Sequence, residues 1–184
     1  MKAHEKSTAT MDTRAGGRVR LVVFAVAGAR FGLELAAVAR VIRAVAVRAV
    51  ADLPEVVAGV VDLHGELIPV FDVRRRLGLP ARAIGPDDQF LVARAARRTV
   101  ALVVDAVEGV SEFPADTVLP AAEIARDDGG MVAGVVTHAA GMVVIYDLDK
   151  FLAEADAGQL GRVLAELANT PTEAAGAVNA EGGV

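Results

Sequence analysis

The chain has 184 residues, of which 54% are hydrophobic, and it carries a net charge of −5. This length is sufficient for a hydrophobic core without covalent cross-links. The absence of cysteine excludes disulfides, thiolate catalysis and cysteine-based metal sites.

No segment has the composition of a membrane span. Charged residues or glycines interrupt each apolar run well before the ~18 residues that a spanning helix requires. The first residues are charged and lack the apolar core of a secretory signal peptide. We therefore expect a cytoplasmic protein with no direct membrane insertion.

In chain order, residues 1–17 are expected to form a disordered arm. Short apolar runs rich in Val, Ile and Phe follow, and these favour strands over helices. The expected strands are 21–26, 31–35, 56–63, 67–71, 90–93, 100–104, 132–136 and 142–146. Helical spacing relates Val38, Val41 and Ile42 and recurs in 154–168, where we expect a C-terminal helix. A disordered tail is expected at 169–184.

The sequence contains an internal repeat. Residues 59–77 recur without a gap at 134–152, and residues 31–41 match residues 100–110 further upstream. Five positions of the longer match are identical: Gly59 and Gly134, Val60 and Val135, Val61 and Val136, Asp72 and Asp147, Leu77 and Leu152. Duplication predicts two similar lobes, at about 19–80 and about 87–152.

Asp72 and Asp147 occupy matched positions of this repeat, which raises the question of a catalytic carboxylate pair. Each follows an expected strand and precedes a short helical turn, where an aspartate caps the free N–H groups of the first turn. We therefore interpret both as helix N-caps.

The sequence Asp62-Leu63-His64-Gly65-Glu66 is the strongest candidate for a metal or acid–base site, because alternate residues of a strand point the same way. Gly65 indicates a turn, however, and a turn breaks that common face. The second copy of the repeat has no corresponding acidic or imidazole side chains. An exposed polar hairpin tip is the main interpretation, and a surface that contacts a partner and a metal site are the alternatives.

Charge is unevenly distributed along the chain. Residues 1–104 have a net charge of +6, whereas residues 105–184 have a net charge of −11. Opposite poles favour oriented docking, although an acidic tail that only aids solubility explains the same pattern. Overall acidity and only 4% aromatic residues argue against nucleic acid binding.

Catalytic motifs are lacking. The two serines, Ser7 and Ser111, are not in a nucleophile elbow, and the glycine pairs lack the strand-to-helix setting of a phosphate-binding loop. We expect no enzyme and no cofactor.

Four ordered segments carry a family resemblance. The stretch 54–79, PEVVAGVVDLHGELIPVFDVRRRLGL, resembles the signature of the CheW-like domain. Residues 21–41 resemble its opening strands, residues 100–107 its central apolar segment, and residues 134–152 its closing segment. The resemblance covers residues 19–152 of an expected domain at 18–153.

The resemblance implies a mainly β fold: two SH3-like five-stranded β-barrel lobes related by a pseudo-twofold, with short helices and a C-terminal helix. It also implies a non-catalytic adaptor that couples chemoreceptors to a CheA-type histidine kinase. The expected partners are the regulatory domain of that kinase and the cytoplasmic tip of a chemoreceptor, in arrays at the inner face of the membrane. A small β-barrel module for another peptide or metabolite is the alternative, and a metal-dependent hydrolase using Asp62, His64 and Glu66 is a further one.

The resemblance also implies a receptor-facing surface. It comprises these residues: Val38, Arg40, Gly59, Asp62, His64 and Gly65. Arg40 stands where many members have Glu, and Asp62-Leu63-His64-Gly65 replaces Asn-Leu-Arg-Gly. These changes alter electrostatic matching with a receptor tip and leave the pathway open, including outputs other than flagellar swimming.

Overall fold

The computed structural model describes residues 17–124, 130–138, 141–153 and 159–169. The expected arm up to residue 16, the start of the expected C-terminal helix at 154–158 and the tail from residue 170 lie outside the described residues.

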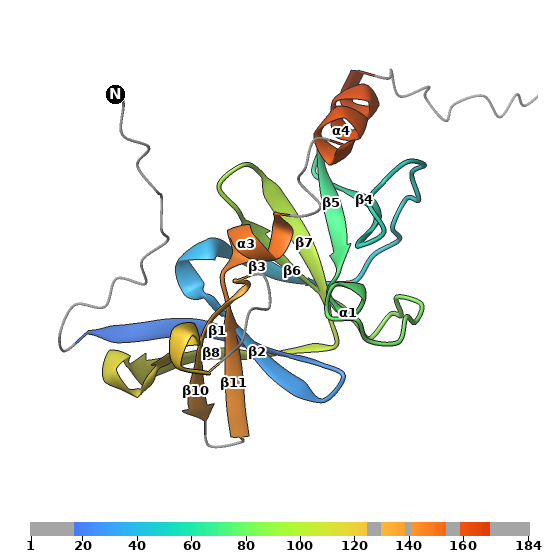
Figure 1. The fold of residues 1–184 in the computed structure, drawn as a ribbon. Coiled ribbons are helices and arrows are strands. Elements are labelled where there is room, and N and C mark those ends of the chain that lie inside the picture. Colours follow the sequence, from blue (N-terminus) through green and yellow to red (C-terminus); the bar gives the residue numbers. More distant parts are fainter. Residues whose placement is uncertain (1–16, 125–129, 139–140, 154–158, 170–184) are drawn as a thin grey trace, which may run out of the picture.

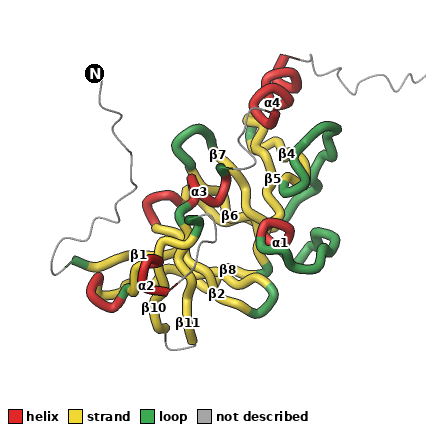
Figure 2. Tube along the Cα trace, in the orientation of Figure 1, coloured by secondary structure: helices red, strands yellow, loops and turns green. Residues whose placement is uncertain are grey.

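Strands make up most of the described chain, and short helices lie at its margins (Figure 1, Figure 2). The strands are β1 (Arg18–Val26), β2 (Ala29–Glu34), β3 (Val38–Arg43), β4 (Val57–Leu63), β5 (Glu66–Asp72), β6 (Gln89–Arg94), β7 (Thr99–Val104), β8 (Ala106–Pro114), β9 (Leu119–Pro120), β10 (Val132–His138) and β11 (Gly141–Tyr146). The helices are α1 (Val73–Arg76), α2 (Ala121–Ile124), α3 (Leu148–Leu152) and α4 (Gln159–Asn169), with single 3-10 turns η1 (Leu35–Ala37) and η2 (Ala115–Thr117). The expected mainly β fold with short helices and a C-terminal helix is confirmed.

The strands form two sheets with matching order. The six-stranded sheet has the order β8-β1-β2-β11-β10-β9, and the five-stranded sheet has the order β3-β6-β7-β5-β4. Repeat-related strands occupy equivalent places, and each sheet contains one parallel pair, β2 with β11 and β7 with β5. The sixth strand, β9, pairs with Val135, and its counterpart is a single bridge between Arg48 and Val60. The repeat therefore specifies a two-lobed architecture.

Each sheet takes strands from both halves of the chain. Strands β1 and β2 of the first half pair with β8 and β11 of the second half, whereas β3, β4 and β5 share a sheet with β6 and β7. The expected boundaries at about 19–80 and about 87–152 therefore do not coincide with the sheets. The chain crosses between sheets through η1 after β2, and again between β7 and β8.

The buried apolar side chains form three cores, one within each sheet and a central one shared by both sheets. In β6, Phe90 and Val92 lie in the core of the five-stranded sheet, whereas Leu91 and Ala93 lie in a central core shared by both sheets. Strand β1 divides its side chains in the same way between the central core and the core of the six-stranded sheet. The central core stabilises both sheets because it contains side chains from each of them. Each buried Val, Leu or Phe contributes about 1.5–3 kcal/mol.

The region 38–43 corrects a sequence expectation, because it forms strand β3 rather than a helical turn. Its register shifts between Val38 and Arg40, which leaves Ala39 as an extra residue in a β-bulge. The bulge brings Val38 and Val41 opposite Ala93 and Leu91, two residues of the central core. A bulged strand thus produces the three-residue spacing that otherwise indicates a helix.

Strand β8 repeats this bulge. Its register shifts at Glu108, so Val107 pairs with Phe24 and Val110 pairs with Val22. Both partners belong to the central core. The three-residue spacing shared by the two copies of the repeat is therefore a signature of two equivalent bulged edge strands.

The repeated glycines Gly59 and Gly134 lie within strands and allow another chain segment to approach. A Cβ atom at Gly59 would lie 2.3 Å from the carbonyl oxygen of Arg48, and one at Gly134 would lie 2.7 Å from that of Leu119. Gly59 also has a φ of +150°. Both positions therefore require glycine because of close backbone packing.

The repeated aspartates cap helices, as expected. Asp72 accepts a hydrogen bond from the backbone N–H of Arg75, and Asp147 accepts one from that of Lys150, each at 3.2 Å. The same carboxylates form ion pairs with these two side chains. Helices α1 and α3 then meet, because Arg76 donates to the Phe151 carbonyl oxygen at 2.9 Å.

Helix α4 adds Leu160 to the central core. Among the described residues, no helix has the length and apolar character needed to cross a membrane.

Candidate functional site

The Asp62–Glu66 segment is the tip of the β4–β5 hairpin. His64 and Gly65 both have positive φ, at 61° and 87°, as a two-residue type I′ turn requires. Asp62 closes the turn by accepting a hydrogen bond from the Gly65 backbone N–H at 2.6 Å. The Asp62, His64 and Glu66 side chains are exposed. The described residues contain no group of three or more potential ligands placed to hold a metal ion.

Strand registers place this tip at the same end of the five-stranded sheet as Val38 and Arg40. Val38 pairs with Ala93 near the end of β6, and β6 continues into the turn before β7. Strand β5 runs parallel to β7, with Val70 opposite Ala101, so its first residue, Glu66, lies toward the beginning of β7. Val38 is half-buried against the central core, and Arg40 is exposed.

Gly59 differs from the other expected site residues because it is buried beneath the segment at Arg48. It contributes no surface of its own. Its role in the structure is to let that segment cross β4, which fixes the strand that carries Asp62.

The structure adds a surface that the sequence interpretation missed, and we call it the edge surface. It lies on β3, an edge strand of the five-stranded sheet, and on β8, an edge strand of the six-stranded sheet. Its residues are those on the face of each strand that points toward the central core: Val38, Val41 and Arg43 of β3, and Val107, Val110 and Glu112 of β8. Val41 and Val110 remain 39% and 53% exposed. The strands meet at Gln89, which lies opposite Arg43 and accepts a hydrogen bond from the Val107 backbone N–H at 2.7 Å.

The edge surface is symmetric in its valines and asymmetric in charge. The repeat relates Val38 to Val107, Val41 to Val110, and Arg43 to Glu112. Glu112 pairs with Arg18 and Arg20 at 3.5 and 3.2 Å. By contrast, the exposed Arg43 side chain has no carboxylate partner among residues the structure describes, and neither does Arg40, which lies opposite Val92 on the other face of β3. The β3 side of the edge surface is therefore cationic.

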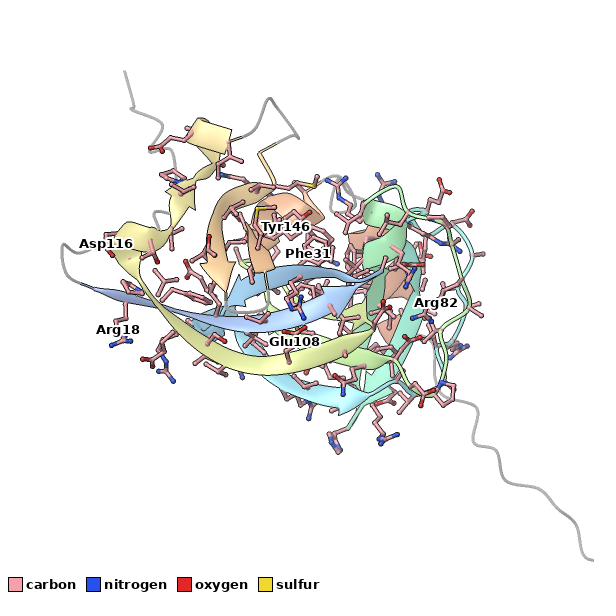
Figure 3. All side chains as sticks on the ribbon, turned by 90° about the horizontal axis from the view of Figure 1, so that it is seen from below. Arg18, Phe31, Arg82, Glu108, Asp116 and Tyr146 are labelled. Atoms are coloured by element: carbon pink, nitrogen blue, oxygen red, sulfur yellow. The ribbon has the colours of Figure 1, made fainter. Side chains whose placement is uncertain are left out.

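A second charged cluster, which the sequence did not predict, connects the lobes and consists of Arg74, Arg82, Asp88 and Asp105. Asp105, at the crossing between β7 and β8, accepts hydrogen bonds from Arg74 at 2.9 Å, from Arg82 at 2.7 Å and from the Ala27 backbone N–H at 2.7 Å. Arg82 also pairs with the buried Asp88. Arg82 is labelled in Figure 3.

These contacts shift the acid–base equilibria of the cluster. Burial acts to raise the pKa of Asp105, but hydrogen bonds from Ala27, Arg82 and Arg74 outweigh it and lower that pKa. The hydrogen bond from Arg82 lowers the pKa of Asp88. The same two carboxylates raise the pKa of Arg82. These shifts keep Asp105, Asp88 and Arg82 charged near neutral pH, so their ion pairs stabilise the contact between the lobes.

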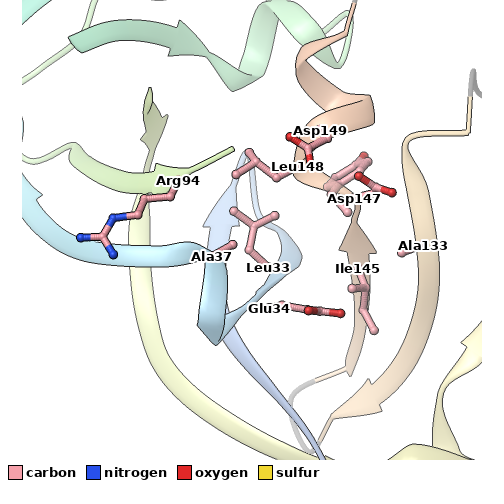
Figure 4. Close-up of a pocket in the computed structure, with 10 residues that line it drawn as sticks. Leu33, Glu34, Ala37, Arg94, Ala133, Ile145, Asp147, Leu148 and Asp149 are labelled. Carbon is pink, nitrogen blue, oxygen red and sulfur yellow. The ribbon is translucent and has the colours of Figure 1, made fainter. Parts of the chain in front are cut away.

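A pocket of about 150 Å³ lies beside the other crossing, at η1 (Figure 4). Its rim carries Glu34, Asp147 and Asp149, and Arg94 points away from the other labelled residues. Asp147 caps α3, and Asp149 accepts a hydrogen bond from the Ala96 backbone N–H at 2.7 Å. Two of the three carboxylates therefore already serve the fold.

The fold and its surfaces define a two-lobed scaffold protein. The chain belongs to the CheW-like domain family, whose model matches residues 20–156. The suspected resemblance is confirmed, together with a chemotaxis scaffold or adaptor role and the expectation of a protein that is not an enzyme.

Individual relatives agree with this assignment. The chain is 29% identical to the chemotaxis protein CheW of Rhizobium meliloti over 135 residues, which cover 73% of this chain and 86% of that protein. It is 24% identical to the chemotaxis protein CheW of Klebsiella aerogenes, covering 78% of this chain and 89% of that one. The crystal structure of the scaffolding protein TtCheW from Thermoanaerobacter tengcongensis superposes with a TM-score of 0.68 at 26% identity, covering 74% and 93% of the two chains.

Proposed function

We propose that this protein couples chemoreceptors to a CheA-type histidine kinase in cytoplasmic arrays at the inner face of the membrane. The adaptor makes and breaks no bonds. By holding receptor and kinase on one rigid body, it lets receptor signals bias the equilibrium between kinase states.

The receptor tip is proposed to contact Val38, Arg40, Asp62, His64 and Gly65, with Gly59 supporting the hairpin from beneath. The observation that carries this assignment is that strand β3 and the β4–β5 tip lie at one end of the same sheet. These residues lie far apart in the sequence, and strand pairing brings them to a common end on a well-packed core. The kinase regulatory domain is proposed to bind through a separate surface of ordinary size, about 1,200–2,000 Å² in total.

Co-sedimentation with the regulatory domain of the cognate kinase and the receptor signalling fragment tests the proposal. We expect a ternary complex and a change in kinase autophosphorylation. A protein that neither sediments with them nor alters autophosphorylation is not this adaptor, and a binding module for another peptide or metabolite would then be the better assignment.

His64→Glu is expected to weaken receptor binding about three- to tenfold, because it adds a negative charge to a tip that already carries Asp62 and Glu66. Thr137→Glu is the matched control, since Thr137 is exposed on the equivalent hairpin of the other lobe. Thermal unfolding of both variants verifies the fold. Unchanged binding by His64→Glu would remove His64 from the interface.

A further inference from the structure

Helix α4 is attached to the body mainly through its first turn. Its apolar residues follow the three- and four-residue spacing of one helix face: Leu160, Val163, Leu164 and Leu167. Of the α4 side chains that the structure describes, only Leu160 is fully buried, and Leu164 packs against the central core from a half-buried position. A helix of 11 residues is marginally stable in isolation. The docked position of α4 therefore depends largely on Leu160.

The docked helix lies against the turn between β6 and β7. A Cβ atom added at Gly161 would lie 3.6 Å from Nη2 of Arg98, a residue of that turn. Ala95, at the beginning of the turn, packs against the central core, to which Leu160 also belongs. Figure 1 shows α4 at this end of the five-stranded sheet. The position of α4 is thus fixed relative to the strand order of that sheet.

The strand order places α4 between two groups of residues that are proposed to contact the receptor. In the order β3-β6-β7-β5-β4, the β6–β7 turn lies between β3 and the β4–β5 hairpin. Val38 at the start of β3 and the hairpin tip at Asp62–Gly65 lie at the same end of the sheet as this turn. A receptor segment that contacts both Val38 and the tip must therefore cross the β6–β7 turn.

The docked helix and such a receptor segment compete for space. An α-helix with its side chains is about 10–12 Å across, so α4 fills the region over the turn that the receptor segment has to cross. A ligand that binds only one of two forms of a protein shifts the equilibrium toward that form. Receptor binding and docking of α4 are then mutually exclusive.

We propose that α4 is an autoinhibitory cap, which docks through Leu160 beside the β6–β7 turn and leaves it when the receptor binds. The inference rests on the proposed function and adds a regulation of the same site. The apparent affinity for the receptor is lowered in proportion to the fraction of molecules in which α4 has left the turn.

A substitution that releases the helix tests the cap in the full-length chain. Leu160→Ala is expected to bind the receptor signalling fragment about three- to tenfold more tightly than the wild type, which corresponds to α4 being docked in about 70–90% of wild-type molecules. Leu167→Ala is the matched control, because it makes the same change at a half-buried position near the other end of α4. It is expected to bind like the wild type. Thermal unfolding verifies that both variants are folded at the temperature of the binding assay.

A cross-link that holds the helix in place tests the opposite direction without altering the core. The chain contains no cysteine, so Arg98→Cys combined with Gly161→Cys introduces the only two thiols. A short bifunctional thiosulfonate reagent that joins them is expected to weaken receptor binding at least ~3-fold relative to the untreated double variant. Reductant, which releases the cross-link, is expected to restore binding.

The outcomes separate the cap from the adaptor function. If the receptor fragment binds the wild type but binds no more tightly to Leu160→Ala, and the cross-link leaves its binding unchanged, α4 is not a cap and the adaptor function stands. Amide hydrogen exchange in α4 is expected to accelerate on receptor binding, and slower exchange would show that the receptor covers α4 rather than displacing it. If the wild type and every variant bind no receptor fragment, the proposed function fails, and the inference fails with it.

Discussion

At the scale of single residues, Asp105 connects parts of the chain that belong to different sheets. Its carboxylate accepts hydrogen bonds from Arg74 of helix α1, which follows the five-stranded sheet's β5, and from Arg82 in the segment between the halves. It also accepts one from the backbone N–H of Ala27, in the β1–β2 turn of the six-stranded sheet. Removal of this charge leaves two guanidinium groups without their shared acceptor. A half-buried charge that loses its partner costs more than an exposed ion pair is worth.

Asp105→Asn is therefore expected to lower the free energy of unfolding by about 2 kcal/mol, measured by urea denaturation at pH 7. Asp116→Asn is the control, because Asp116 is exposed and belongs to η2. A loss no larger than that of the control would mean that Asp105 does not fasten the lobes.

The effect of pH follows from the same carboxylates. The folded-state pKa values of Asp105 and Asp88 are lowered, so their contribution to stability is present above the ordinary aspartate pKa and is lost as pH falls through the folded-state values. The stability difference between wild type and Asp105→Asn should therefore shrink as the pH is lowered below about 4. A difference that stayed constant at low pH would contradict this assignment.

At the scale of elements, both copies of the repeat place glycine where a neighbouring segment crosses a strand. Gly59→Ala and Gly134→Ala are each expected to destabilise the fold by about 3 kcal/mol, because the new methyl group meets a backbone carbonyl that cannot move aside. Gly85→Ala is the matched control, since its nearest neighbour would lie at an ordinary 3.8 Å. Circular dichroism melts give the comparison, and equal melting temperatures for all three variants would refute it.

The sequence predicted the elements whose pattern is local. Alternating or continuous apolar runs identified eight strands, and the aspartate before each helical turn identified both caps. Strand β3 was missed because a bulge changes the two-residue alternation into a three-residue spacing. Strand β8 was not identified because Gly109 and several polar residues interrupt its pattern, although the match of Val107 and Val110 to β3 was visible in the repeat.

The candidate site was predictable only in part, for a similar reason. The hairpin tip is a local feature, and His64-Gly65 marks its turn in the sequence. The contribution of Arg43 depends on its lack of a carboxylate partner, and that is decided by tertiary pairing. One sequence signal did exist, because the repeat aligns Arg43 with Glu112 and so reverses the charge at an otherwise equivalent position.

At the scale of the whole molecule, the central core makes the two sheets a single cooperative unit. Leu102 is buried in that core, between strands of both sheets. Leu102→Ala is expected to cost about 2–5 kcal/mol and to lower the stability of both lobes equally. Hydrogen exchange at β4–β5 and at β10–β11 reports on the two lobes, and separate unfolding of one lobe would contradict the prediction.

The exchange of strands between the halves bears on how such a chain arose. One half of the sequence contains strands for parts of both sheets and completes neither, because β1 needs a strand equivalent to β8, and β3 needs one equivalent to β6. Two identical copies of such a half have the complete set, provided that each lends strands to the other across a twofold axis. An intertwined homodimer of half-length chains would satisfy this strand pattern, and a single chain that carries both halves allows matched positions to differ, with arginine at position 43 and glutamate at position 112.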